Sequence, residues 1–227
     1  MTVAVECDDR ESLHGLLLRV AAVSQLRPRQ VLKAVGIAPA RPLHPSDVDG
    51  LIGLTGADRA WLLHRVPIDD AASPLFAWAA QTWRSPGPLL GSHAPACPRC
   101  VHETGVARLE WDLAFYGACP VHRLPLVARC PACNRTLTWQ RPAVDVCRCR
   151  RHLRAPDGKD LPESMFVWLQ WVADSLKKSD EIQMPAELRL LFPGAVSIDG
   201  TWRIIRAFGV IAEDEASDVA LTGPEKA

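Results

Sequence analysis

The chain contains 227 residues, of which 48% are hydrophobic and 23% charged, and its formal net charge is zero. This is the composition of an ordinary soluble globular protein, and the length suits one large domain or two small ones. No run of about 18 apolar residues occurs, which excludes a membrane-spanning helix. The segment 1–10 is acidic and lacks the apolar core of a signal peptide, so we expect a cytoplasmic protein.

The first predicted elements are helices. Residues 11–24 have the apolar spacing of an amphipathic helix, with one face formed by Leu13, Leu16, Leu17 and Val20. Asp8 and Glu11 have the spacing of a capping box, which predicts that the helix begins there. A second short helix is expected over 28–35, because a proline stands at its start and a glycine just past its end.

Two further helices are predicted over 46–52 and 57–65, separated by a glycine-containing turn. This helix-turn-helix arrangement occurs in DNA-binding modules, but any small helical bundle gives the same pattern, so both interpretations stay open. Residues 75–83 are expected to form a turn of helix. The stretch 85–96 is rich in Pro and Gly and is expected to be a linker.

The cysteines are the most informative residues of the chain. Seven of the eight, with one histidine, form four close pairs: Cys97/Cys100, Cys119/His122, Cys130/Cys133 and Cys147/Cys149. A close pair of soft ligands is half of a tetrahedral zinc site, and two halves joined by a loop complete it. The spacing therefore predicts two structural Zn²⁺ sites, Cys-x2-Cys-x18-Cys-x2-His and Cys-x2-Cys-x13-Cys-x-Cys. In three pairs a proline follows the first ligand, and such a turn directs backbone amides at the sulfur.

Disulfide bonds and free thiols are the alternatives to metal binding. Disulfides require an oxidising compartment, which the expected cytoplasmic location does not offer. A catalytic zinc needs an open coordination position, whereas each predicted site has four ligands. We therefore expect the ions to contribute folding free energy and no chemistry. Cys7 lies apart from the four pairs and is expected to be a free thiol.

The charge of the chain is unevenly distributed. Residues 97–154 carry ten arginines and four acidic residues, whereas 155–227 carry seven basic and thirteen acidic residues. A guanidinium group binds phosphate through two parallel hydrogen bonds, and it can equally cover an acidic protein surface. The candidates for binding nucleic acid or a protein partner are Arg99, Arg123, Arg135, Arg148, Arg150 and Arg151.

Helical patterns return after the cysteine-rich segment. A helix with an apolar stripe is predicted from Ser164, its expected N-cap, to Leu176, with shorter helices over 186–192 and 198–208. Beyond residue 212 the sequence is acidic and lacks periodicity, which indicates a frayed tail. We expect a mostly α protein with small zinc-ribbon or knuckle β elements. Its predicted parts are a helical, helix-turn-helix-like domain (1–84), a linker (85–96), a tandem zinc module (97–154), a C-terminal helical segment (155–211) and the tail (212–227).

Several stretches carry a resemblance to one known family. They are Glu11-Ser12-Leu13 with Leu17-Leu18-Arg19-Val20-Ala21, Leu54-Thr55-Gly56, Cys97-Pro98-Arg99-Cys100, Leu109-Glu110-Trp111-Asp112-Leu113 and, most densely, Cys119-Pro120-Val121-His122-Arg123-Leu124-Pro125-Leu126 with Cys130-Pro131-Ala132-Cys133. Over about residues 8–153 the chain resembles the TniQ family of transposition target-selection proteins, which includes the TnsD proteins. Arg150 departs from the family pattern, in which a small residue, often Gly, follows the last ligand.

The resemblance implies a short, non-catalytic adaptor, because the long C-terminal DNA-reading extension of TnsD-type members is missing. Such a protein recognises a target site, or a complex already bound there, and recruits an AAA+ ATPase of the TnsC/TniB type. The implied partners are that ATPase, target DNA or a CRISPR effector ribonucleoprotein, and a second copy of the chain, with no membrane. The implied location is the bacterial cytoplasm, at the nucleoid when the protein is active.

Two other classes of function compete with the adaptor. A stand-alone zinc-containing helix-turn-helix DNA-binding regulator is the alternative, although the zero net charge and the acidic C-terminal third argue against it. An enzyme is not expected, because the sequence contains no phosphate-binding Gly-x4-Gly-Lys-Ser/Thr loop and no nucleophile elbow.

Overall fold

The structure is a computed structural model, and it describes residues 5–39, 42–69, 75–85, 89, 93–155, 161–177, 182–191 and 197–205. Contacts between residues divide the chain into two compact units, Met1–Ile182 and Gln183–Ala227, and each is described by itself. Within the described ranges, no helix is both long enough and apolar enough to cross a lipid bilayer. The predicted division into five parts stays a prediction.

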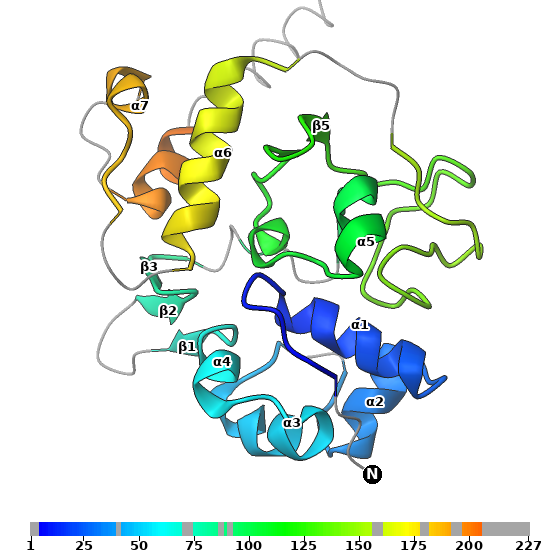
Figure 1. Cartoon of the computed structure of the whole chain (residues 1–227). Helices are drawn as coiled ribbons and strands as arrows, with labels where there is room; N and C mark the ends of the chain where they lie inside the picture. Colours follow the sequence, from blue (N-terminus) through cyan, green and yellow to red (C-terminus); the bar gives the residue numbers. More distant parts are fainter. Residues whose placement is uncertain are drawn as a thin grey trace, which may run out of the picture. The chain divides into compact units, whose positions relative to one another are not determined.

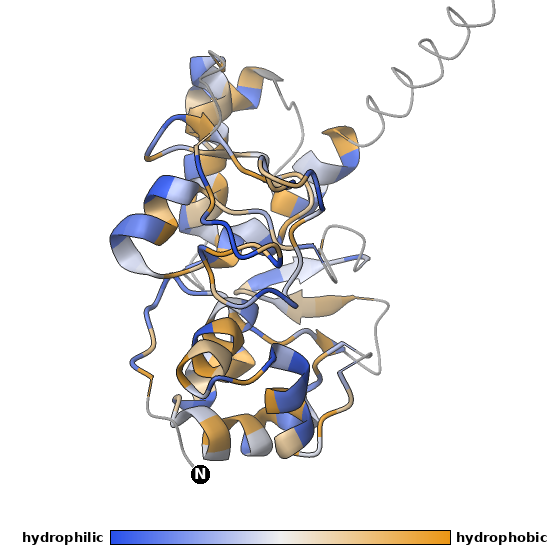
Figure 2. Cartoon of the chain, turned by 90° about the vertical axis from the view of Figure 1, so that its right-hand side faces the viewer, coloured by the Kyte–Doolittle hydropathy of each residue, from blue (hydrophilic) through white to orange (hydrophobic). Residues whose placement is uncertain are grey.

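Four helices form a bundle near the N-terminus of the first unit (Figure 1). They are α1 (Leu13–Val23), α2 (Pro28–Ala34), α3 (Val48–Thr55) and α4 (Arg59–Leu63). The helices are amphipathic (Figure 2), and their apolar faces meet in a buried cluster that includes Leu16, Val20, Val31, Leu51 and Leu62. Each such side chain contributes about 1.5–3 kcal/mol when it is removed from water, so the cluster accounts for the packing of the bundle.

The first helix begins after Ser12 and not at the predicted capping box. The Oγ atom of Ser12 accepts a hydrogen bond from the backbone N–H of Gly15 at 3.0 Å. Asp8 instead accepts a hydrogen bond from the backbone N–H of Arg10 at 2.8 Å, in a turn that precedes the helix. The helix itself is confirmed, and its predicted start is wrong because Ser12, and not Asp8, caps it.

A short turn, residues 56–58, joins α3 to α4. Gly56 ends α3 with a φ of 70°, a left-handed conformation that glycine adopts at little cost. Asp58 begins α4, because its carboxylate accepts hydrogen bonds from the backbone N–H groups of Ala60 and Trp61. The predicted order of helix, turn and helix is therefore present. Its second helix has five residues.

A small antiparallel sheet follows the bundle, where a turn of helix was predicted. Its strands are β1 (Ile68–Asp69), β2 (Phe76–Trp78) and β3 (Gln81–Trp83), in that order. Phe76 pairs with Trp83, and the indole N–H of Trp83 donates to the backbone oxygen of Trp78 at 3.1 Å. The helical prediction for 75–83 is wrong: residues 76–78 and 81–83 pair as antiparallel strands, and the side chains of Phe76, Trp78 and Trp83 are buried.

The cysteine-rich segment contains α5 (Pro98–Thr104), the 3₁₀ helix η2 (Leu109–Asp112) and the hairpin strands β4 (Ala118–Cys119) and β5 (Leu124–Pro125). Backbone hydrogen bonds join its start to the N-terminal bundle. The N–H of Ser12 donates to the oxygen of Ala107 at 2.8 Å, and the N–H of Leu109 donates to the oxygen of Arg10 at 2.8 Å. The bundle and the cysteine-rich segment therefore pack together within the first unit.

The last long helix is α6 (Glu163–Ser175), which packs against β4 and η2. Its buried face includes Phe166, Leu169 and Val172. The predicted N-cap, Ser164, lies inside the first turn, and Pro162 occupies the position before the helix. The second unit contains α7 (Ala186–Leu191) and a helical stretch over 198–205. The rest of the helix predicted over 198–208, and the predicted tail, lie outside the described residues. The expected helix-rich fold with small antiparallel sheets is thus present.

Candidate metal centres

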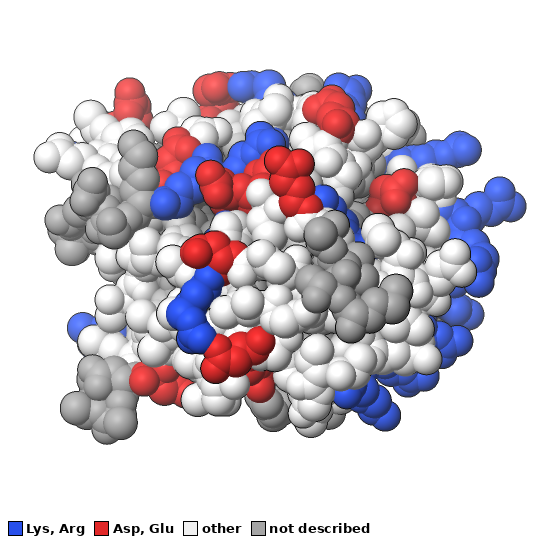
Figure 3. All heavy atoms as spheres, turned by 60° about the horizontal axis from the view of Figure 1, so that its bottom comes forward, with Lys and Arg blue, Asp and Glu red and all other residues white. Residues whose placement is uncertain are grey.

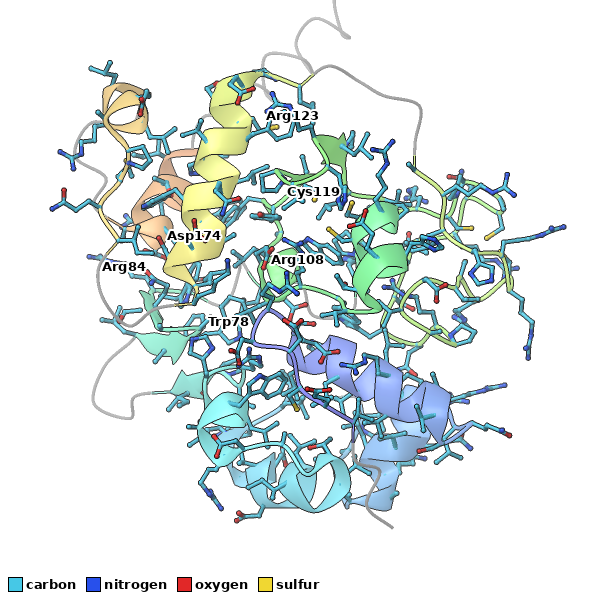
Figure 4. The ribbon with its side chains drawn as sticks, viewed as in Figure 1. Trp78, Arg84, Arg108, Cys119, Arg123 and Asp174 are labelled. Carbon is cyan, nitrogen blue, oxygen red and sulfur yellow. The ribbon has the colours of Figure 1, made fainter. Side chains whose placement is uncertain are left out.

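The first cluster consists of Cys97, Cys100, Cys119 and His122, which come from two local structures. Cys97 is the N-cap residue of α5, and Cys100 lies in its first turn. Cys119 ends β4, and His122 lies in the loop between β4 and β5. Ala96 and Val127 exchange two backbone hydrogen bonds, so they hold the helix start beside the hairpin. Figure 4 shows Cys119, at the end of β4, near α5.

The geometry of the first cluster fits a single tetrahedral ion. The Nδ1 atom of His122 lies 3.5 Å from the sulfur of Cys97, 3.2 Å from that of Cys100 and 3.6 Å from that of Cys119. The sulfurs of Cys100 and Cys119 are 3.6 Å apart. A tetrahedral zinc with Zn–S bonds of about 2.3 Å places its sulfurs about 3.8 Å apart, so these four atoms surround a space of the right size.

The imidazole of His122 is oriented by an acidic residue from the neighbouring helix. Its Nε2 atom lies 3.0 Å from each carboxylate oxygen of Glu103, which belongs to α5. A hydrogen bond from Nε2–H to this carboxylate leaves the lone pair of Nδ1 directed at the three sulfurs. Carboxylate–histidine pairs of this kind fix the tautomer of a metal-binding imidazole.

The second cluster is built from two similar turns. In the first turn, the N–H of Cys130 donates to the oxygen of Arg135 at 2.9 Å. In the second turn, the N–H of Cys147 donates to the oxygen of Arg151 at 2.9 Å. Each turn contains one non-glycine residue in the left-handed conformation, Asn134 with a φ of 55° and Arg150 with a φ of 62°. Glycine adopts this conformation at the least cost.

The sulfurs of the second cluster have the same compact arrangement. Cys130 and Cys149 are 3.7 Å apart, and Cys133 and Cys147 are 3.8 Å apart, measured between sulfur atoms. In each cluster all four ligand atoms lie within 4.8 Å of one another. Each cluster can therefore hold one metal ion with four protein ligands, as the spacing in the sequence predicts, and such a set leaves no open coordination position.

The surroundings lower the pKa of one cysteine in each cluster and raise the pKa of Cys100, Cys119, Cys133 and Cys147. A hydrogen bond from the thiol of Cys100 is the largest influence on Cys97 and lowers the pKa of Cys97 against the effect of burial. Burial raises the pKa of Cys130, but the backbone N–H groups of Ala132 and Cys133 and the neighbouring thiols lower its pKa to about 7. The expected amide-to-sulfur arrangement is therefore present in these turns.

The six candidate arginines fall into two groups. Arg123 forms an ion pair with Glu163 and lies over the ring of Phe166, 4.5 Å from its centroid, beside the start of α6 (Figure 4). The others are exposed and have no hydrogen bond or ion pair from their side chains within the described ranges, namely Arg99, Arg135, Arg148, Arg150 and Arg151. Their positions leave these five guanidinium groups accessible to a partner.

Some residues of the metal segment were missed by the sequence analysis. Glu103 is one, because a glutamate on a short helix gives no sign of the histidine that it contacts. Arg141 is another: its side chain is only 1% exposed, and its Nη1 atom donates to the oxygen of Ala94 at 2.6 Å. His14 stacks on Trp139 with ring centroids 4.9 Å apart, so α1 also contacts the loop of the second cluster. No spacing rule predicts these long-range contacts.

The fold and the two clusters define a helix-rich protein with two compact metal-binding centres. A sequence model of the TniQ family matches residues 3–126, which is more than half of the 227 residues. The chain therefore belongs to the TniQ family, which is associated with transposition. The match includes the first cluster and ends before the second. A search of curated proteins gave no match.

Proposed function

We propose that the protein is a non-catalytic targeting adaptor in DNA transposition. It links a target-site complex, either target DNA or a CRISPR effector ribonucleoprotein, to an AAA+ ATPase of the TnsC/TniB type. The observation that carries this proposal is the family match over residues 3–126, within which the first cluster holds α5 beside the β4–β5 hairpin.

The proposed ions are two structural Zn²⁺, held by Cys97, Cys100, Cys119 and His122 and by Cys130, Cys133, Cys147 and Cys149. Thiolate and imidazole donors in a tetrahedral arrangement suit zinc. When bound, each ion cross-links two turns that are far apart in the sequence, so its binding free energy adds to the stability of the fold. The residues around the clusters then present the surface that contacts partners.

The adaptor is favoured over a stand-alone helix-turn-helix regulator by the size and charge of α4. This helix spans Arg59–Leu63, five residues, which is less than two turns. Its single basic residue, Arg59, is paired with Asp49. A recognition helix in the major groove needs several side chains that reach base edges, and α4 offers few.

Purified protein and its neighbouring genes test the proposal. We expect two zinc ions per chain by elemental analysis, and we expect Cys119→Ser and Cys130→Ser to lose one ion each and to unfold at lower temperature. Co-purification with the AAA+ ATPase encoded nearby should be direct, and deletion of the gene should abolish targeted insertion. The proposal fails if insertion keeps its normal frequency and site choice without the gene, or if the gene neighbourhood lacks a transposase and an ATPase.

A further inference from the structure

The second cluster is surrounded by exposed arginines with almost no acidic residues nearby. Between residues 113 and 156 the only acidic residue is Asp145, and its carboxylate lies 2.8 Å from Nδ1 of His152. The arginine face is defined here by six exposed residues, Arg129, Arg135, Arg148, Arg150, Arg151 and Arg154. Figure 3 shows Lys and Arg side chains gathered along the right-hand edge of the molecule, with no Asp or Glu at that edge.

The metal cluster brings these arginines together from two separate turns. Arg135 closes the turn that carries Cys130, and Arg151 closes the turn that carries Cys147, through the backbone hydrogen bonds already described. The four sulfurs of the two turns lie within 4.8 Å of one another. A bound dication with four thiolates carries a formal charge of −2, so six arginines and one aspartate leave a net charge of about +3 on this face.

Five of the six side chains of the arginine face make no hydrogen bond or ion pair within the described ranges. Elsewhere in the first unit arginines pair with carboxylates, as Arg19 does with Glu11 and Arg123 with Glu163. On the arginine face, Arg129 donates only to the backbone oxygen of Asn134, and the other five side chains have no hydrogen bond or ion pair within the described ranges. Their charges therefore remain available to an anionic ligand.

The arginine face lacks the exposed apolar and aromatic side chains that the centre of a protein interface needs. The large exposed apolar side chains among the described residues are Val23, Leu26, Ile68, Val121, Met165 and Leu190, and none belongs to 127–155. The only Phe, Tyr or Trp of 127–155, Trp139, is 5% exposed and cannot stack on a base. Protein interfaces depend on apolar and aromatic anchors, whereas binding to a polyanion is driven by release of counterions and needs none.

We propose that the arginine face binds the sugar-phosphate backbone of a nucleic-acid duplex and does not read its sequence. This inference rests on the proposed function, in which it supplies the contact between the adaptor and its target nucleic acid. Guanidinium groups suit phosphates because each group can donate two parallel hydrogen bonds to phosphate oxygens. The metal cluster holds the two turns that carry these groups at a fixed separation. The absence of an exposed Phe, Tyr or Trp side chain over 127–155 excludes stacking of bases on such rings as a source of affinity there.

The test measures binding of the metal-loaded full chain to two unrelated 25-base-pair DNA duplexes by fluorescence anisotropy at several salt concentrations. The variant Arg135→Gln/Arg148→Gln/Arg151→Gln removes three charges and leaves the backbone of both turns unchanged. We expect it to make the slope of log K against log salt shallower by about 3, since each phosphate contact contributes about 0.9. The control Arg27→Gln/Arg29→Gln/Lys33→Gln, on exposed positions at α2, should leave the slope unchanged.

Two results for the unmodified protein would overturn the inference at once: no binding to DNA, or tighter binding to polyglutamate than to DNA. It would also be overturned if the variant and the control lost equal DNA affinity, or if the unmodified protein bound the two duplexes with very different affinities. Metal content and unfolding temperature are measured alongside. If the triple variant loses metal, the single changes Arg148→Gln and Arg151→Gln replace it, each with an expected slope change of about 0.9. Co-purification with the ATPase is scored separately, so a failure here is distinguishable from a failure of the adaptor proposal.

Discussion

The Nε2 atom of His122 lies 3.0 Å from both carboxylate oxygens of Glu103, while its Nδ1 atom faces the sulfurs of the first cluster. The two residues come from α5 and from the β4–β5 loop, so the hydrogen bond also joins the two halves of the cluster. Glu103 is therefore a positioning residue for the histidine. It is half exposed and can be changed without opening the core.

Glu103→Ala should speed the loss of metal from the first cluster by about tenfold, because residues that orient a metal ligand typically affect affinity by 10–100-fold. Glu103→Gln should have a smaller effect, since the amide oxygen can still accept the hydrogen bond. The measurement uses Co²⁺-loaded protein and a competing chelator, because a site with three thiolates and an imidazole absorbs at different wavelengths from a site with thiolates alone. Asp49→Ala, which removes an exposed carboxylate from another ion pair, is the control and should release metal at the normal rate.

Gly15→Ala should destabilise the protein although alanine favours helices. A methyl group at Gly15 would lie 3.0 Å from both the Cβ and the backbone oxygen of Ala107, where α1 meets the cysteine-rich segment. Overpacking of this kind costs about 1–3 kcal/mol. Gly53→Ala in α3 is the matched control, because nothing lies within 4 Å of its added methyl group. Urea unfolding should show a gain of up to about 1 kcal/mol for Gly53→Ala, and a gain for Gly15→Ala would contradict the close approach.

Arg150→Gly should raise the free energy of unfolding by about 1 kcal/mol, because a non-glycine residue in the left-handed region carries a backbone cost. The φ of Arg150 is 62°, in the turn that carries two ligands of the second cluster. Thermal unfolding of the metal-loaded protein measures the change. Arg148→Gly, at a position with ordinary φ, removes the same charge and should be neutral or destabilising. Equal effects of the two changes would show that charge, and not conformation, is responsible.

Glu110→Gln should make the stability of the protein less dependent on pH. Burial raises the pKa of Glu110 above its usual value of 4.5, against smaller opposing effects that include Arg108. The folded state therefore binds this proton more tightly than the unfolded state, so the free energy of unfolding falls as pH rises from about 4.5 through the folded-state pKa. Glutamine removes this loss, which amounts to about 1.4 kcal/mol per unit of pKa difference.

The measurement for Glu110 is the difference in unfolding free energy between variant and unmodified protein from pH 5 upward. We expect the difference to increase in favour of the variant as pH rises, and to level off above the folded-state pKa. Glu163→Gln, at a residue that is mostly exposed, is the control and should show little pH dependence. A constant difference for Glu110→Gln would mean that its carboxylate is not desolvated in the folded protein.

The parts of the fold that local chemistry controls were predictable from the sequence. All eight residues of the two clusters follow from ligand spacing, because pairs two or three residues apart must lie on one turn. The helix around Leu16 follows from its apolar period. The start of that helix was mispredicted, since Asp8 and Ser12 are both good caps and only the packing of Gly15 against Ala107 selects between them.

The parts that depend on distant contacts were not predictable. The hairpin of β2 and β3 turns at Ala79 and Ala80, with φ values of 50° and 59°. Tight hairpin turns usually contain Asn or Gly, so two alanines give no turn signal and favour a helix instead. The contact between Glu103 and His122 joins two separate elements, so neither the helical nor the strand period of the sequence predicts it. The separation of Arg123 from the other candidate arginines depends on where α6 begins.

The pairing of Ser12 with Ala107 also has a consequence for the order of events during synthesis. The two residues are far apart in the chain, and at about 5–20 residues per second the ribosome needs about 5–20 s to travel from one to the other. Until then the side of α1 that contacts Ala107 stays exposed to water. The contact of α1 with Ala107 forms only when the cysteine-rich segment has emerged. The packing of the first helix is thus completed by a segment that the ribosome makes long after it.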